Sequence, residues 1–240
     1  MAAQDGKSGG SGAQERTDTT SRVDTAVFDI DGTLVDSNYH HVLAWYRAFR
    51  SHEVVVPAWH LHRAIGMGGD QLVAHVAGDE VEERLGDALR DLHDENYAAV
   101  RHEVVPFEPA RALLQEVGRR GITVVLGSSG KPEDVDQALD LLDAREIAAS
   151  WTSSADAGNS KPAPDIVEVA VRSVDGSHAV MVGDSIWDVE AAARLGVPSV
   201  CVRNGGFGVD ELREAGAAEV WESLEELLDG LDRSLLGRPR

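Results

Sequence analysis

The sequence predicts an α/β protein: a parallel sheet with helices on both faces, and an all-helical segment inserted after the first strand. From residue 109 onward, short apolar runs typical of buried strands alternate with segments of helical periodicity. An apolar run at residues 26–28 predicts one earlier strand, and between it and residue 105 only helical patterns occur. Strands that alternate with helices are typical of a parallel sheet covered on both faces.

The inserted segment begins with a helix whose apolar residues recur at i, i+3, i+4 and i+7. These residues are Val42, Trp45, Tyr46 and Phe49. We expect a second helix from Pro57, a glycine-rich break at residues 65–69 and a short helix from Asp70. The apolar residues that mark a longer helix are Val81, Leu85, Ala88 and Leu92. Residues 103–106 then form the return linker.

The rest of the chain alternates between the two kinds of element. The predicted strands occupy residues 122–126, 150–152, 179–182, 198–202 and 218–221. The predicted helices lie at residues 110–117, 135–142, from 164 onward, up to 196, and at 224–231. We therefore expect a core made of residues 23–36 and 106–232, with residues 37–105 as the helical insert. Residues 1–22, which are polar and have no hydrophobic segment, are expected to form a disordered tail, and residues 233–240 a C-terminal tail.

Composition excludes several classes of partner. The net charge of −20 disfavours binding to nucleic acid and to anionic membranes, and no apolar run is long enough to span a bilayer. The single cysteine, Cys201, lies in an apolar run and is expected to be buried, so no intrachain disulfide forms, as is usual in the cytoplasm. Of the three lysines, Lys7 lies in the tail, whereas Lys131 and Lys161 both lie in loops after strands, where a phosphate needs a cation.

The first strand ends in two aspartates, Asp29 and Asp31, followed by Gly32. Side chains at i and i+2 of a strand point to the same side, so we expect the two carboxylates to converge at the carboxyl end of the sheet, where open parallel sheets bind ligands. Two carboxylates this close need a cation or a proton between them, and Mg²⁺ prefers oxygen ligands. The alternative is an ordinary strand end and turn.

Three later loops carry further candidate residues. Residues 127–132 form a small-residue loop in which Ser128 and backbone N–H groups can bind a phosphoryl group. Lys161 lies before a double proline and can neutralise a carboxylate and a phosphate together. Asp184 follows the next strand, and Asp188, four residues on, is expected on the same helical face. A polar turn or a helix N-terminus is the alternative for each loop taken alone.

These four stretches, in this order, resemble the motifs of the haloacid dehalogenase superfamily of phosphohydrolases. The resemblance covers residues 23–231 and implies a Rossmann-like core. The helical insert resembles the cap of phosphoglycolate phosphatases, sugar phosphatases and beta-phosphoglucomutase. The resemblance further implies that Asp29 is the nucleophile that forms an aspartyl-phosphate and that Asp31 is the general acid and base.

The same resemblance assigns the other site residues. Ser128 is expected to hold phosphoryl oxygens, and Lys161 to offset negative charge at the nucleophile. Mg²⁺ is expected on Asp29, the backbone carbonyl of Asp31 and Asp184, with Asp188 orienting that shell.

Substrate contacts are expected from Gly32, Ser129, Lys131 and His41. Lys131 matches a lysine that holds a distal phosphate in the mutase, but residues 66–69 lack the mutase's arginine.

We therefore predict a Mg²⁺-dependent phosphatase acting on a small phosphomonoester such as phosphoglycolate or a sugar phosphate. A phosphosugar mutase is the enzymatic alternative, and an inactive metabolite-binding or interaction protein is the non-enzymatic one. Residues 205–208 are expected to form a loop near the mouth of the site rather than a nucleotide fingerprint.

Overall fold

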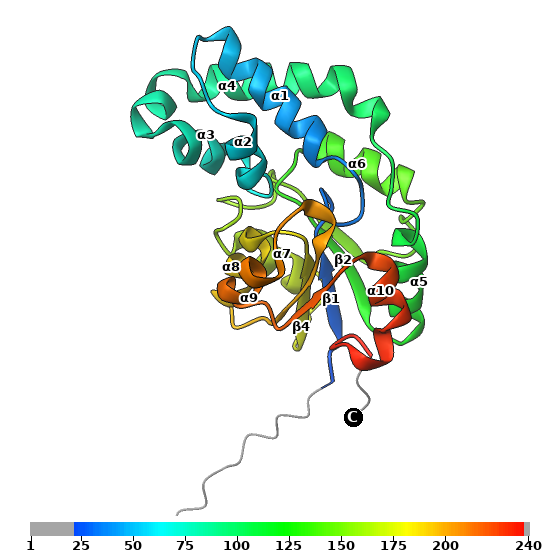
Figure 1. The fold of residues 1–240 in the computed structure, drawn as a ribbon. Helices are drawn as coiled ribbons and strands as arrows, with labels where there is room; N and C mark the ends of the chain where they lie inside the picture. Colours follow the sequence, from blue (N-terminus) through cyan, green and yellow to red (C-terminus); the bar gives the residue numbers. More distant parts are fainter. Residues whose placement is uncertain (1–21, 238–240) are drawn as a thin grey trace, which may run out of the picture.

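A computed structural model describes residues 22–237, so most of the predicted N-terminal tail, residues 1–21, lies outside the described residues, as do residues 238–240. Six parallel strands form one sheet in the order β3-β2-β1-β4-β5-β6 (Figure 1). The strands are β1 (Thr25–Phe28), β2 (Thr123–Gly127), β3 (Ser150–Thr152), β4 (Ala179–Gly183), β5 (Ser199–Val202) and β6 (Glu219–Trp221). The predicted parallel sheet is confirmed.

The first strand occupies the centre of the sheet. Phe28, its last residue, pairs with Leu126 of β2 on one side and with Val182 of β4 on the other. The backbone N–H of Asp29 continues this pairing by donating to the carbonyl of Val182 at 2.9 Å. The segments that follow β1, β2 and β4 therefore leave the sheet side by side at its carboxyl edge.

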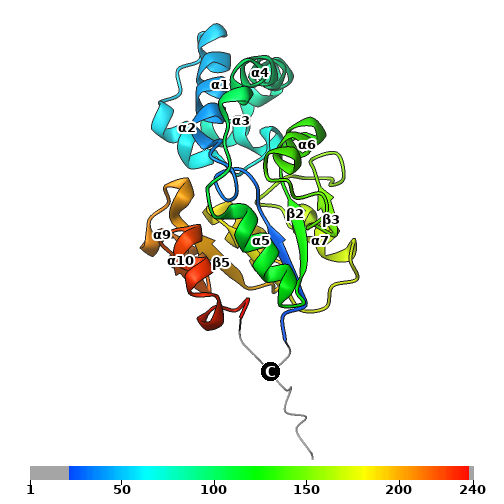
Figure 2. The same cartoon turned by 90° about the vertical axis from the view of Figure 1, so that its right-hand side faces the viewer.

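Helices cover both faces of the sheet, as predicted (Figures 1 and 2). One face carries α5 (Ala110–Arg119), α6 (Pro132–Leu141) and α10 (Leu224–Asp229), and the other α7 (Asp165–Arg172), α8 (Ile186–Ala193) and α9 (Val209–Ala215). Three short 3₁₀ turns complete the elements: η1 (Arg101–Glu103), η2 (Arg203–Gly205) and η3 (Leu231–Arg233). Alternate residues of β1 divide between the two layers: Phe28 packs in the core under α5, and Val27 in the core under α7.

Four helices lie between β1 and α5, above the carboxyl edge of the sheet (Figure 1), and we call them the helical insert. They are α1 (Asn38–Ser51), α2 (Ala58–Ala64), α3 (Gly69–Ala77) and α4 (Asp79–Val100). The insert has a hydrophobic core of its own, built around Phe49, Leu61, Leu72 and Leu89. The chain enters and leaves it side by side, because the N–H of Asp36 donates to the carbonyl of Val105 at 2.9 Å.

The buried face of α4 differs from the one that its apolar pattern marked. The buried residues of α4 are Gly86, Leu89, His93 and Tyr97. Ala88, part of the predicted stripe, is exposed, while Val81, Leu85 and Leu92 are half-buried. The physical reason is the partner: the second half of α4 packs on α1 directly above the strand ends, and this face is aromatic and polar.

The folded core extends beyond its predicted end at residue 232. Leu236 is buried in the cluster that contains the first strand, and the Ser234 side chain is buried with it. Residues 233–237 are therefore not a free tail, because Leu236 packs in the same core as Leu231 of η3. Cys201 is buried, as predicted. Within residues 22–237, no helix combines the length and the apolar character that a membrane crossing needs.

Candidate active site

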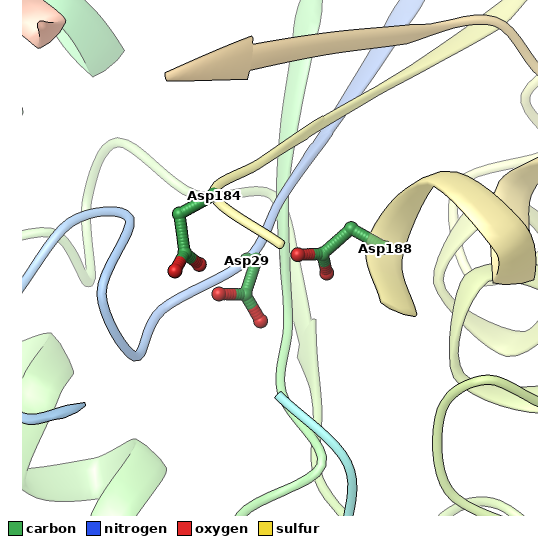
Figure 3. Close-up of side chains that lie close together, drawn as sticks. All are labelled: Asp29, Asp184 and Asp188. Atoms are coloured by element: carbon green, nitrogen blue, oxygen red, sulfur yellow. The ribbon is translucent and has the colours of Figure 1, made fainter. Parts of the chain in front are cut away.

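Three buried carboxylates meet at the carboxyl edge of the sheet (Figure 3). Asp29 follows β1, Asp184 follows β4, and Asp188 comes from the first turn of α8. One oxygen from each lies within 4.8 Å of the others. The strand order explains this convergence, because β1 and β4 are neighbours in the sheet although Thr33, just after β1, and Asp184, just after β4, are 151 residues apart in the chain.

A single buried lysine faces this cluster. Lys161 Nζ contacts Asp29 Oδ1, lies 2.7 Å from Asp188 Oδ1 and donates to the carbonyl of Gly127 at 3.2 Å. The Lys161 side chain is fully buried. Burial alone would lower its pKa, but the charges of Asp188 and Asp29 outweigh burial and raise it. Lys161 is therefore a permanent cation beside Asp29.

Two side chains that the sequence did not single out hold the carboxylates in place. Thr33 Oγ1 lies 3.1 Å from Asp29 Oδ2 and 3.0 Å from Asp184 Oδ1, and so joins the two. Asn38, the first residue of α1, donates from Nδ2 to Asp184 Oδ2 at 3.2 Å. The oxygen of the Asn38 amide is buried without a hydrogen-bond partner within the described chain.

The charge balance of the cluster fits a divalent cation. Burial raises the pKa of Asp29 to about 7 even though the Lys161 charge opposes it. Burial, together with the charges of Asp29 and Asp188, also raises the pKa of Asp184 well above its ordinary value. One lysine thus leaves three buried carboxylates short of positive charge, which is the deficit that a metal ion bound to carboxylate oxygens supplies.

Asp188 lies in the cluster, but its position relative to Asp184 differs from the predicted one. Asp184 lies before α8 rather than on it, because Ser185 is the N-cap of this helix. The two aspartates therefore do not share a helical face. Ser185 Oγ donates to Asp188 Oδ2 at 2.7 Å, and its backbone N–H donates to the same oxygen at 3.1 Å, which leaves Oδ1 facing Lys161. The capping box fixes the orientation of Asp188.

Asp31 lies beside the cluster but turns to other partners. The strand ends at Phe28, so the alternation expected for Asp29 and Asp31 does not apply, although both line the same cavity. Ser37 Oγ donates to Asp31 Oδ1 at 2.6 Å, His41 Nε2 lies 3.3 Å from the same oxygen, and Ser128 Oγ donates to Oδ2 at 3.3 Å. Burial would raise the pKa of Asp31, but these hydrogen bonds outweigh it and lower the pKa to about 2.

The predicted phosphate-binding loop lies beneath the same cavity. Ser128 accepts from the N–H of Gly130 at 2.8 Å, and Ser129 Oγ accepts from the N–H of Lys161 at 3.3 Å. Ser129 and Lys131 line the cavity. Gly32, at φ +78°, instead lies against Asn38 and Asp184, where a Cβ would approach their side-chain atoms to within 2.6 Å.

The helical insert adds a row of polar side chains above Asp31. His41 Nδ1 lies 3.2 Å from His93 Nε2, and His93 Nδ1 lies 3.2 Å from Asp94 Oδ1. The other oxygen of Asp94 contacts Lys131 of the core. Burial lowers the pKa of His93 to about 4 despite the neighbouring Asp94, so His93 is neutral near pH 7. The row links the insert to the core across the cavity.

The amino-acid sequence around this site matches a known protein family. A family model described as haloacid dehalogenase-like hydrolase matches residues 23–196. The chain belongs to the haloacid dehalogenase-like hydrolases. It is therefore an enzyme of the hydrolase class, and the family predicted from the motifs is confirmed.

Relatives of this hydrolase include named phosphatases. It is 28% identical over 180 residues to validoxylamine A 7'-phosphate phosphatase of Streptomyces hygroscopicus subsp. limoneus, covering 72% of this chain and 82% of that protein. It is 25% identical to the pyrophosphatase PpaX of Bacillus cereus, covering 75% of this chain and 83% of the relative. A hydrolase from Pseudomonas syringae has the same fold, with a TM-score of 0.82, 28% identity, and coverage of 87% and 98% of the two chains. The predicted enzyme class, a phosphatase of this family, agrees with these relatives.

The residues that the sequence did not reveal in this hydrolase share one property: their neighbours are distant in the chain. Thr33 and Asn38 bond to Asp184, and His93 lies 52 residues from His41. Gly205, in the predicted loop near the site, packs so closely on Asp184 that a Cβ there would lie 1.5 Å from Oδ2. In the sequence, only two features pointed to these residues: Thr33 follows Asp31 by two positions, and His93 interrupts the apolar pattern of α4.

Proposed function

We propose that this hydrolase is a Mg²⁺-dependent phosphatase that cleaves a small phosphomonoester through an aspartyl-phosphate on Asp29. The observation that carries the proposal is the environment of the Asp29 carboxylate. One of its oxygens contacts the buried cation Lys161, and the other lies 3.1 Å from Thr33 Oγ1, which also bonds to Asp184. Such a carboxylate is held in position and has compensating charge for attack on an anionic substrate.

We propose that Asp29, the backbone carbonyl of Asp31 and Asp184 hold the Mg²⁺ ion. When bound, the ion supplies positive charge that stabilises the charge developing on the phosphoryl oxygens. Asp188 would orient the site through Lys161, to which it is bound from the other side. The shortage of positive charge at Asp29 and Asp184, seen in their raised pKa values, supports this assignment.

In the first step, an Asp29 oxygen attacks phosphorus while Ser128 and the N–H groups of its loop bind the phosphoryl oxygens. Asp31 protonates the leaving oxygen, and then accepts a proton from the water that hydrolyses the aspartyl-phosphate. With its pKa at about 2, Asp31 is ionised while His41, Ser37 and Ser128 bind it. The negative phosphoryl group raises that pKa as it enters, which favours the protonated form of Asp31 that a general acid needs.

We further propose that residues 37–105 act as the cap that closes over a core made of residues 23–36 and 106–237, five residues beyond the predicted end of the core. Phosphoglycolate and sugar phosphates are the candidate substrates, and the phosphatase relatives support a small phosphorylated one. A cytoplasmic location is part of the proposal, supported by the single buried cysteine.

Phosphate release from a panel of phosphomonoesters, with Mg²⁺ and with EDTA, tests the proposal. We expect release that requires Mg²⁺ and is lost in Asp29→Asn. Trapping the protein with beryllium fluoride, which imitates the phosphoryl group on a carboxylate, is expected to require Asp29 and Mg²⁺. Isomerisation of beta-glucose 1-phosphate with little free phosphate would instead identify a mutase, and Mg²⁺ binding without turnover of any compound would identify a binding protein.

A further inference from the structure

A cavity of about 320 Å³ extends from Asp29 and Asp31 into the space between the insert and the core. It is lined by Asp29 and Asp31 and by residues of α1, α3, α4 and the loop before α7, and we call the part of the cavity away from Asp29 and Asp31 its outer end. This volume lies near the lower limit of small-molecule sites, roughly 300–1,000 Å³. If the phosphoryl group lies at Asp29, the outer end receives the leaving group of the substrate.

Each strong cation that lines the cavity within residues 22–237 already has carboxylate partners. Lys131 Nζ contacts Asp94 Oδ2. Arg90 Nη1 donates to both oxygens of Glu82, at 2.9 and 3.0 Å, and Nη2 donates to Asp87 at 2.8 Å. These ion pairs compensate the charge of both cations, so a second anion on the substrate would compete with carboxylates that are already bound. Arg90 also donates to the carbonyl of Gly69, in the glycine-rich segment 65–69, at 3.1 Å. Its positive charge is nevertheless compensated by Glu82 and Asp87.

The outer end of the cavity is instead rich in carboxylates. Asp70 and Asp94 of the insert line it, and Asp134 of α6 lines the cavity closer to Asp31, beside Gly130. Burial and the charge of Asp31 raise the pKa of Asp134, a sign that negative charge is already crowded here. The remaining wall is aromatic: the rings of Trp45 and His93 stack with centroids 4.3 Å apart. Such a surface offers hydrogen-bond acceptors for hydroxyl or ammonium groups and a flat apolar wall for C–H groups.

We propose that the leaving group is a polyol with no second anionic group, such as a sugar, a cyclitol or an amino sugar. The proposal rests on the phosphatase function proposed above. A carboxylate or second phosphate on the substrate would meet three aspartates, and to gain a cation it would have to draw Lys131 away from Asp94. Asp94 would then lose the lysine from its partly buried site and keep only its contact with His93, which is neutral. Phosphoglycolate, bisphosphates and pyrophosphate are therefore disfavoured as substrates.

The first test compares kcat/KM for glucose 6-phosphate, glucosamine 6-phosphate, phosphoglycolate, glucose 1,6-bisphosphate and pyrophosphate, with p-nitrophenyl phosphate as a general substrate. We expect both sugar monophosphates to be hydrolysed more efficiently than the three compounds that carry a second anion. Turnover of p-nitrophenyl phosphate with a preference for any of those three overturns this inference alone. No phosphate release from any compound overturns the proposed function, and this inference with it.

The second test changes the charge of the outer end. Asp94→Asn frees Lys131, so we expect the ratio of kcat/KM for phosphoglycolate to that for glucosamine 6-phosphate to rise about tenfold or more, the scale of one charge acting over a few ångströms. Asp70→Asn is expected to move the ratio in the same direction and provides a second measurement if the first variant misfolds. Asp91→Asn is the matched control, because Asp91 is exposed on the same helix and does not line the cavity. An unchanged ratio in both test variants would refute the proposal.

Discussion

At the scale of single residues, the carboxylates of Asp29 and Asp31 lie in different environments. Asp29 is buried against Lys161 and the other acidic groups, and its pKa rises to about 7. Asp31, two residues on, is surrounded by hydrogen-bond donors, and its pKa falls to about 2. Carboxylates that differ in this way are suited to different roles, because burial and hydrogen bonding act on opposite protonation states.

Replacing Asp31 tests its proposed role directly. We expect Asp31→Asn to lower kcat by roughly 10²-fold or more, the usual scale for loss of general acid–base catalysis. Asp36→Asn, which changes an exposed carboxylate in the same segment, is the control and is expected to retain activity. Steady-state phosphate release measures both, and a rate near that of the unmodified protein in Asp31→Asn would contradict the assignment.

The raised pKa of Asp29 predicts how stability depends on pH when metal is absent. Between about pH 4 and 7 the folded protein keeps a proton on Asp29 that the unfolded chain has released. Stability therefore falls as the pH rises through this window, and this contribution is lost above about 7. We expect the Tm in EDTA to be lower at pH 8 than at pH 5, with a smaller difference in Asp29→Asn.

Added Mg²⁺ is expected to raise the Tm at pH 8, since an ion that binds only the folded state stabilises it. If the Tm in EDTA changed with pH in Asp29→Asn as much as in the unmodified protein, groups other than Asp29 would cause the pH dependence.

At the scale of elements, the site depends on loops that approach one another too closely for side chains. The 3₁₀ turn η2 brings the Gly205 backbone against Asp184, so that a Cβ would overlap Oδ2. The carbonyl of Gly205 also lies 2.9 Å from His62 Nε2 of the insert. This one turn therefore supports the acidic cluster from one side and the insert from the other.

Gly205→Ala is expected to displace Asp184 and to weaken Mg²⁺ binding by about tenfold or more, the scale seen when groups that orient a metal ligand are lost. A Mg²⁺ titration followed by the change in Tm measures this. Gly118→Ala in α5 is the control: a Cβ there meets no atom within 4 Å, so we expect unchanged Mg²⁺ binding and a gain of about 0.5–1 kcal/mol in stability. Equal Mg²⁺ affinity in the two variants would contradict the proposed support of Asp184.

At the scale of the whole molecule, one of the contacts that hold the insert against the core is made by α2. Arg63 lies over the ring of Phe207, 3.7 Å from its centroid, and pairs with Glu211 of α9 at 2.7 Å. Trp187 of α8 donates from its indole to the Arg63 carbonyl at 3.0 Å. The cavity lies between these two bodies, so its shape depends on how they dock.

Loosening this contact is expected to weaken substrate binding without altering the acidic cluster. Arg63→Ala removes an exposed ion pair and a cation–π contact, together about 1–2 kcal/mol. We expect KM for the preferred substrate to rise roughly fivefold to twentyfold, with Mg²⁺ affinity unchanged. Arg84→Ala, which removes an exposed ion pair within α4, is the control. Equal KM values in the two variants would show that the docking contact does not control binding.

The sequence alone determined the alternation of strands and helices, the helical insert, and the candidate residues at the strand ends. These were predictable because each depends on a local pattern: apolar periodicity, a carboxylate or hydroxyl directly after a strand, or a lysine in the loop that follows one. Asp29, Ser128, Lys161 and Asp184 are near one another because neighbouring parallel strands end at one edge.

Only the tertiary structure decided which face of α4 is buried, and with it the positions of His93 and Asp94 above Asp31. It also decided that Thr33 joins Asp29 to Asp184, and that Leu236 belongs to the core. The physical reason is that these contacts join residues far apart in the chain. Which side chains a helix or loop buries depends on what packs against it, and a local pattern does not contain that partner.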